Sequence, residues 1–296
     1  MSETREKAVE QGSEKATGRR NGGGGAGAGR LWARMFVGVH TAVVLIPIAV
    51  IAVWAFSSAW PWPSLTPTAL TTRGAELVLS GSQGIGLGVV AGSIGIALAS
   101  AFVATVAATL AARAICLHEW RGRSLLEFGV LLPFLIPSTV FAMGVQVAFL
   151  RIGLSGTVPG VVLSHSIIAL PYATAIMTDV TRGAGTRLEQ AARTLGADWA
   201  RTVWHVTLPS LAPGLVSSMS MGYILSFSQY FLTLLIGGGK VKTFATVLFP
   251  YLSGGDRTVA GAYGLAFILI TLAVFLLFEL LLRKVRPVEA QELYAG

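Results

Sequence analysis

The sequence predicts an all-α, polytopic membrane protein with six transmembrane helices. Hydrophobic residues make up 53% of its 296 residues and charged residues only 12%, whereas soluble domains carry about 25% charged residues. The apolar residues also gather in long uncharged stretches, and a helix needs about 20 such residues to cross a bilayer. The Lys and Arg residues lie between these stretches. This composition and patterning are typical of a chain that lives among membrane lipids.

The N-terminal part combines a polar segment with the first apolar stretch. Residues 1–30 end in a glycine-rich run and bury too little apolar surface to offset the entropy of ordering, which predicts a disordered cytoplasmic tail. Residues 31–82 are expected to hold the first span, at about 35–56, and an external loop. Trp60 and Trp62 at the start of that loop fit the aromatic belt of a membrane interface.

Five further spans are expected within residues 83–285, at about 83–112, 128–150, 158–178, 214–236 and 259–282. Residues 286–296 would then form a cytoplasmic C-terminal tail. Pro133 and Pro137 interrupt the third span and Pro171 the fourth. Each proline removes a backbone donor and clashes with the preceding turn, so these spans are predicted to be kinked.

The distribution of Lys and Arg predicts the orientation. With the N-terminus inside, six spans place 17 of these residues on the cytoplasmic side and five outside. Cytoplasmic loops carry the excess of positive charge, so both termini are expected to be cytoplasmic. Topology therefore accounts for the formal net charge of +8, and no aromatic-interleaved basic patch indicates nucleic-acid binding.

The titratable residues indicate neither an enzyme nor an ion-coupled carrier. Cys116 is the only cysteine and the four histidines are scattered, so no metal site, catalytic group or bound cofactor is expected. No carboxylate lies at the centre of a span, and Glu279 lies near the inner end of the last one. Ion-coupled carriers usually need ionisable groups there. An ion-gradient-driven secondary transporter is therefore the alternative and not the leading hypothesis.

The loop at 181–212, between the fourth and fifth spans, is the most informative segment. Thr186-x-x-Glu189 has the spacing of a capping box that starts a helix. Gly196 suits the end of that helix, and a second short helix is expected from Asp198 until Leu208-Pro209 stops it. An exposed face of small residues suits a helix that docks on a partner protein. An amphipathic helix on the membrane surface has the same pattern, and the loop alone leaves both open.

The same loop resembles the EAA loop of binding-protein-dependent ABC importer permeases of the type I fold. That family pattern is Glu-Ala-Ala, three residues, Gly, nine residues, an aliphatic residue, any residue and Leu-Pro. The resemblance implies a coupling helix seated in a cleft of a cytoplasmic ATPase. The residues that it places in ATPase coupling are Glu189, Gln190, Ala191, Ala192, Gly196, Leu208 and Pro209.

One departure from the family pattern concerns the first position of the motif. Gln190 stands where the family has Glu, and Glu189 immediately precedes it. The sequence also has no phosphate-binding Gly-x-x-x-x-Gly-Lys-Ser/Thr loop, so ATP is expected to bind a separate ATPase dimer. The resemblance further implies a second permease subunit, identical or homologous, an extracytoplasmic solute-binding protein, and a place in the bacterial cytoplasmic membrane.

The fifth span carries polar residues within an apolar stretch. Such groups are costly in lipid unless they are paired or face water, so they either bond neighbouring helices or line a translocation path. Their sequence and the glycine-rich loop after them resemble permeases for polyamine, thiamine, iron and phosphonate uptake, which implies a small polar cargo. The candidate path residues are Ser226, Ser228, Gln229 and Tyr230.

Overall fold

The computed structural model describes residues 23–60, 64, 66–67, 69–80 and 86–285, and the chain falls into two compact units, Met1–Val53 and Trp54–Gly296. The expected C-terminal tail at 286–296 and residues 1–22 lie outside the described residues. Helix α2 (Gly23–Ala55) begins inside the segment 1–30 that the sequence predicted to be a tail. Its residues Trp32–Ala55 are long and apolar enough to cross a membrane, in agreement with the first predicted span.

Two strands and a short helix lie among the described residues that follow α2. Strands β1 (Ser57–Ala59) and β2 (Ala69–Leu70) form a small antiparallel ribbon, and helix α3 (Arg73–Ser80) follows. Gly74 lets α3 approach its neighbours closely, because a Cβ atom there would lie 2.8 Å from Ala262 Cβ. Arg73 Nη2 of α3 forms an ion pair with Asp256 Oδ2 at 3.2 Å, which fastens this segment to the start of the last helix.

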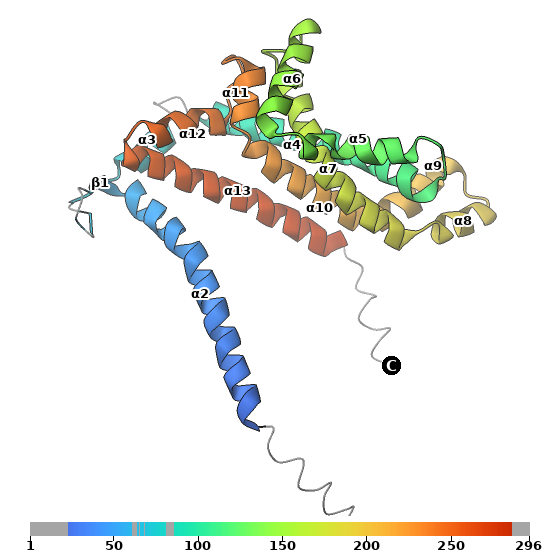
Figure 1. Ribbon diagram of the computed structural model, residues 1–296, viewed down its shortest axis with the longest axis horizontal. Coiled ribbons are helices and arrows are strands. Elements are labelled where there is room, and N and C mark those ends of the chain that lie inside the picture. The colour runs from blue at the N-terminus through green and yellow to red at the C-terminus, as the bar shows by residue number, and fades with distance from the viewer. Residues whose placement is uncertain (1–22, 61–63, 65, 68, 81–85, 286–296) are drawn as a thin grey trace, which may run out of the picture. The chain divides into compact units, whose positions relative to one another are not determined.

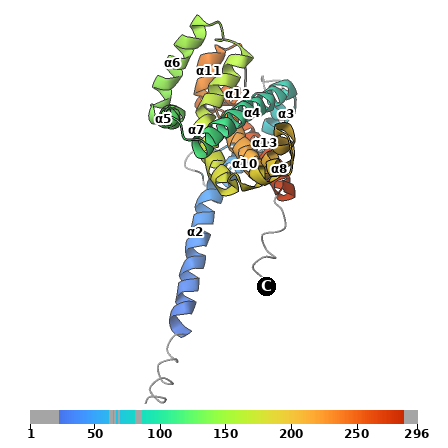
Figure 2. The same cartoon turned by 90° about the vertical axis from the view of Figure 1, so that its right-hand side faces the viewer.

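Three long helices form the centre of the second unit: α4 (Leu87–Leu117), α7 (Val158–Ala184) and α10 (Leu208–Phe227). They pack against one another, as Figures 1 and 2 show. Small side chains permit this close packing, since helix interfaces in lipid favour residues that let backbones approach. A Cβ atom at Gly222 of α10 would lie 3.0 Å from the Cα of Ala101. The fully buried alanines along α4 are Ala97, Ala101, Ala104, Ala108 and Ala112.

The third predicted span is broken and not merely kinked. It consists of α5 (Arg123–Leu135) and α6 (Ser138–Arg151), which are bent by 110° at a break of two residues. The sequence prediction of one kinked helix at 128–150 was wrong here. Ile136 has extended backbone because the residue before a proline is pushed out of the helical region, and Pro137 follows it. Pro171, by contrast, lies inside α7, which continues through it.

The fifth predicted span is also broken, at Ser228–Tyr230. The helix that ends as α10 and the short helix α11 (Phe231–Gly237) are bent by 71° there. Residues 214–249 contain no proline, so the backbone chemistry that breaks α5 from α6 is missing at this point. We call residues 228–230 the α10/α11 break.

Helices α12 (Phe244–Ser253) and α13 (Arg257–Val285) complete the unit. The sequence did not predict α12, which is too short to form a span by itself. Phe244 at its start joins Tyr223, Phe227 and Tyr263 in a buried aromatic core between α10 and α13. Four long apolar helices and two bent pairs give up to six spans among the described residues, which confirms the predicted all-α, six-span class.

Candidate functional site

Residues 186–209, hereafter the 186–209 segment, form two short helices joined at a glycine. Helix α8 (Arg187–Thr194) ends at Gly196, whose φ of 87° lies in the left-handed region that favours glycine. The N–H of Ala197 donates to the carbonyl of Ala192 at 3.0 Å, which closes the helix end. Helix α9 (Trp199–Thr202) then begins at Asp198, whose side chain accepts a hydrogen bond from the N–H of Arg201 at 3.0 Å. The predicted order of helix, glycine and helix is confirmed, but the second helix is not short, because it continues to Phe227.

The predicted capping box at the start of this segment was wrong. Thr186 has helical backbone and its side chain caps no N–H group. Glu189 does not reach back to Thr186, because its carboxylate has stronger partners elsewhere. A charged donor outcompetes a backbone N–H for a carboxylate.

Glu189 fastens α8 to the helical bundle. Arg113 at the inner end of α4 donates two hydrogen bonds to its carboxylate, from Nη1 to Oε1 at 2.8 Å and from Nη2 to Oε2 at 3.1 Å. Thr207 Oγ1 donates a third to Oε1 at 2.7 Å. The hydrogen bond from Arg113 lowers the pKa of Glu189 below its usual value, against the effect of its burial, and Thr207 and the charges of Arg113 and Arg193 lower it further. Glu189 is therefore an ionised anchor inside this chain.

The other residues of the motif lie on both sides of this anchor. Gln190 and Ala191 are exposed, Ala192 is half-buried, and the described side chains of α8 include none that is buried. The sequence prediction that Leu208 and Pro209 stop the second helix was wrong. A π-helical turn, η1 (Val203–Thr207), absorbs the missing N–H of Pro209, since the N–H of Leu208 bonds back to the carbonyl of Val203. One helix therefore runs from Trp199 to Phe227.

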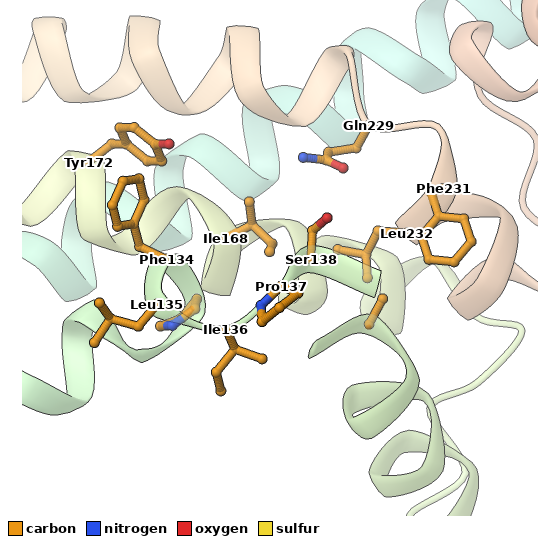
Figure 3. A pocket seen from close by; sticks show the side chains of 12 residues that line it. Phe134, Leu135, Ile136, Pro137, Ser138, Ile168, Tyr172, Gln229, Phe231 and Leu232 are labelled. Carbon is orange, nitrogen blue, oxygen red and sulfur yellow. The ribbon is translucent and has the colours of Figure 1, made fainter. Parts of the chain in front are cut away.

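A pocket of about 460 Å³ lies between the two broken spans. Its wall is formed by residues 133–138 around the break between α5 and α6, by Ile168 and Tyr172 of α7, by Gln229 in the α10/α11 break, and by the first two residues of α11. Figure 3 shows Ser138 and Gln229 pointing toward one another across the opening, whereas Tyr172 lies apart from them, beside Phe134. The polar groups in the lining are uncharged. Such a pocket suits hydrogen bonding to a solute.

The four candidate path residues have different environments. Gln229 lines the pocket, and Tyr230 stacks on Phe249 with ring centroids 3.9 Å apart. Ser228 is exposed, and its hydroxyl donates to the carbonyl of Ile224 in its own helix at 2.9 Å. Ser226 is buried and bonds to another helix. Of the four residues that the sequence grouped as candidates, only Gln229 therefore lines the pocket.

The partner of Ser226 is His165, a residue that sequence analysis did not single out as functional. His165 of α7 is 1% exposed. Its Nδ1 lies 2.8 Å from Ser226 Oγ of α10, and its Nε2 lies 2.9 Å from Thr233 Oγ1 of α11. The imidazole therefore bridges the two helices on either side of the α10/α11 break. A histidine in the middle of an apolar span was the available signal, and its partners are more than 60 residues away.

The described part of the chain contains no group of three or more His, Cys, Asp or Glu side chains placed to hold a metal ion. Cys116 is a free, half-buried thiol in α4, with its sulfur 3.7 Å from the carbonyl oxygen of Thr178. The buried polar side chains described in this unit are hydroxyls and one imidazole, that of His165.

Comparison with known proteins identifies this arrangement. Residues 104–287 match the family model of the binding-protein-dependent transport system inner membrane component. The spermidine/putrescine transport permease PotC of Haemophilus influenzae is 24% identical over 192 residues, which are 65% of this chain and 75% of that protein. The trehalose transport permease SugB of Mycobacterium tuberculosis is 31% identical over 189 residues, which are 62% and 69% of the two chains.

A solved structure has the same fold. It is a bacterial ABC transporter involved in importing the acidic polysaccharide alginate, and one of its chains matches with a TM-score of 0.68 at 17% identity. The match covers 84% of this chain and 94% of that one, and at this identity it speaks for the fold alone. Because the family model covers well over half of the sequence, the chain belongs to the family of binding-protein-dependent transport system inner membrane components and is a permease subunit of an ABC importer.

Proposed function

We propose that this permease subunit forms one half of a solute path and couples to a separate cytoplasmic ATPase through the 186–209 segment. The observation that carries the proposal is the single helix from Trp199 to Phe227. Its first turns belong to the 186–209 segment, and its last turn adjoins the pocket at Gln229. A rigid helix transmits displacement along its length, so movement imposed at the segment reaches the pocket.

The exposed face of the 186–209 segment supports ATPase docking. Leu188, Leu195, Trp199 and Trp204 are between 60% and 88% exposed. Large apolar side chains gathered on an otherwise polar surface mark an interaction site. The residues assigned to coupling are Glu189, Gln190, Ala191, Ala192, Gly196, Leu208 and Pro209, with Glu189 holding the segment in place and the exposed members meeting the partner.

The pocket is assigned to the translocation path, with Gln229 as its main polar side chain from the fifth span. Ser228 and Tyr230 flank it, and Ser226 supports it from within the bundle. The uncharged lining suits a small polar solute. The sequence resemblance suggests polyamine, thiamine, iron or phosphonate, whereas the relatives named above carry spermidine and putrescine in one case and trehalose in the other.

The complete importer then contains an ATPase dimer that binds and hydrolyses ATP, a second permease subunit and an extracytoplasmic solute-binding protein. The permease lies in the bacterial cytoplasmic membrane with both termini cytoplasmic, as the excess of inner Lys and Arg supports. Family membership does not favour the ion-gradient-driven carrier that was weighed from the sequence.

Substitution on the exposed face tests the proposed docking. A Cβ atom at Gly196 meets nothing within 4 Å, so Gly196→Arg adds bulk to the surface and strains only the local backbone. We expect it to weaken binding of the partner ATPase about tenfold, equal to about 1.4 kcal/mol, and to abolish solute uptake. Ala191→Arg should act similarly without backbone strain, because Ala191 is exposed and helical.

Gly238→Arg is the matched control for ATPase binding. Gly238 also has positive φ and open space around its Cβ position, but it lies after α11, at the other end of the bundle. Binding of the ATPase should stay at the parental value in this variant. Undiminished ATPase binding and uptake in both Gly196→Arg and Ala191→Arg would rule out the 186–209 segment as the coupling site.

A further inference from the structure

The cluster of His165, Ser226 and Thr233 has one consistent pattern of hydrogen bonds. Thr233 Oγ1 donates to the carbonyl oxygen of Gln229 at 2.6 Å, and a hydroxyl has only one hydrogen to give. Thr233 must therefore accept from His165, which assigns the ring hydrogen to Nε2. Nδ1 is then an acceptor, and the Ser226 hydroxyl donates to it. With this neutral tautomer, both ring nitrogens of His165 and the hydroxyls of Ser226 and Thr233 each form a hydrogen bond.

The same bonds fix the position of Gln229. The backbone carbonyl of Gln229 lies in the α10/α11 break and accepts no hydrogen bond from any backbone N–H that the structure describes. The hydroxyl of Thr233 donates to it instead. The side-chain amide of Gln229 has no hydrogen-bond partner among the described residues and faces the pocket (Figure 3). The pocket wall is therefore tied through Thr233 to the ring of His165.

His165 is also the only side chain of the described region that bonds to both α10 and α11. No proline lies at this break, so the backbone alone does not impose the bend of 71°. His165 belongs to α7, and the residues before and after it, Ser164 and Ser166, are also buried. Side-chain bonds to a residue of a third helix thus take the place of the proline that holds the other break.

We propose that His165 is a positioning residue that transmits movement of α10 to α11 and thereby to the pocket wall at Gln229. The proposal rests on the proposed function, in which the partner ATPase moves α10 through the 186–209 segment. When α10 moves, Ser226 pulls the ring, and the ring carries Thr233 and α11 with it. Without the bridge, α10 is joined to α11 only through the three residues of the α10/α11 break, and its movement is passed on less completely to α11 and the pocket wall.

Nucleotide-dependent labelling of the pocket tests this coupling without knowledge of the cargo. Cys116→Ser removes the only cysteine of the sequence, and Gln229→Cys places a thiol in the pocket wall. This parent protein is assembled with its partner subunits in lipid vesicles. The rate of reaction with a membrane-impermeant maleimide is measured without nucleotide and with ATP and vanadate. We expect the two rates to differ by about fivefold or more, the lower end of typical coupling between distant sites.

Cutting either arm of the bridge should remove this difference. Ser226→Ala removes the bond to α10 and Thr233→Val the bond to α11, and His165→Ala removes both. In each variant the ratio of the two rates should fall below about twofold while ATP hydrolysis continues, since coupling of that size is under 0.5 kcal/mol. Thr233→Ser keeps the hydroxyl and should restore the parental ratio, which a purely structural effect of lost volume would not do.

Ser164→Ala is the matched control. Its hydroxyl is fully buried beside His165 but bonds only to the carbonyl of Val161 in its own helix, so this variant should keep the parental ratio. Parental ratios in Ser226→Ala and Thr233→Val would overturn the role of His165, even if His165→Ala failed to assemble. A parent protein that shows no nucleotide-dependent change would instead count against the proposed function.

Discussion

The helix from Trp199 to Phe227 is held near each end by one central side chain with two partners, and the two clusters use different chemistry. Near its start, Glu189 accepts hydrogen bonds from Arg113 of α4 and from Thr207 in the π-helical turn. At its end, the His165 ring bonds to Ser226 and Thr233. Each central residue stands beside a local irregularity of the helix, the π turn in one case and the α10/α11 break in the other.

The difference follows from access to water. The side chains of Arg113 and Glu189 keep 27% and 13% of their surface exposed, so a full ion pair is tolerated there. His165 is enclosed by the bundle, where an unpaired charge would be costly and neutral hydrogen bonds are not. This helix is thus held by an ion pair at its partly exposed end, hereafter the wet end, and by neutral hydrogen bonds at its enclosed end, hereafter the dry end.

The largest effect on stability is expected at the dry end. His165→Ala removes a fully buried ring and both of its hydrogen bonds, and we expect it to lower the free energy of unfolding by about 2–3 kcal/mol. Denaturant titration of the purified permease in detergent micelles measures this loss. Ser164→Ala should cost less than about 1 kcal/mol, because only a bond within its own helix is lost. Equal losses in the two variants would mean that the bridge adds nothing to packing.

At the wet end, Glu189→Ala should weaken partner binding in addition to lowering stability. It releases α8 from α4 while leaving the exposed docking face unchanged. We expect ATPase binding to weaken about fivefold, which corresponds to about 1 kcal/mol for a partly exposed, charge-assisted contact. Binding titration of the purified subunits measures this effect.

Glu127→Ala is the control for this variant, because Glu127 pairs with Arg123 on the same helix and is more exposed. Such surface pairs contribute little, so its ATPase affinity should stay at the parental value. An unchanged affinity in Glu189→Ala would show that α8 keeps its position without the anchor.

Near the start of this helix, the sequence predicted some features correctly and others wrongly. The hinge at Gly196 and the helix start at Asp198 are encoded within a few residues, so local patterns were sufficient, as they were for the four unbroken apolar spans. The capping box at Thr186 was predicted wrongly because the side chain of Glu189 bonds to Arg113, which is 76 residues away. Such a contact outweighs local preference and leaves no trace in the spacing.

The breaks in the third and fifth spans also differ in how well the sequence predicts them. Pro133 and Pro137 announced an irregularity in the third span, although their effect is a bend of 110° and not a kink. The α10/α11 break has no such residue, and it depends on His165 and Thr233, which are 68 residues apart. Helix α12 was missed because ten apolar residues are too few for a span and fit a loop equally well. Contacts between distant segments, which depend on packing, account for most of what the sequence did not reveal.

A dependence on pH distinguishes the charged fastening from the neutral one. The pKa of Glu189 in the folded protein lies below its ordinary value of 4.5. The ion pair therefore contributes fully above pH 4.5 and is lost as pH falls through the lower folded pKa. We expect the difference in unfolding temperature between the parent and Glu189→Gln to be constant from pH 8 to pH 5 and to shrink below pH 4.5. A difference that already shrinks between pH 8 and pH 6 would contradict this assignment.

The smallest expected effect concerns the hydroxyl that ties Glu189 to the π-helical turn. Thr207→Val keeps the shape of the side chain and removes only the donor 2.7 Å from the carboxylate. Alone it should cost about 1 kcal/mol of unfolding free energy, because a hydrogen bond to a charged group is lost while Arg113 still neutralises the carboxylate. In a Glu189→Ala background the same change should cost less than about 0.3 kcal/mol, since the acceptor is already gone. Equal costs in the two backgrounds would mean that Thr207 acts through packing of the π turn, and the fastening at the wet end would then consist of the ion pair alone.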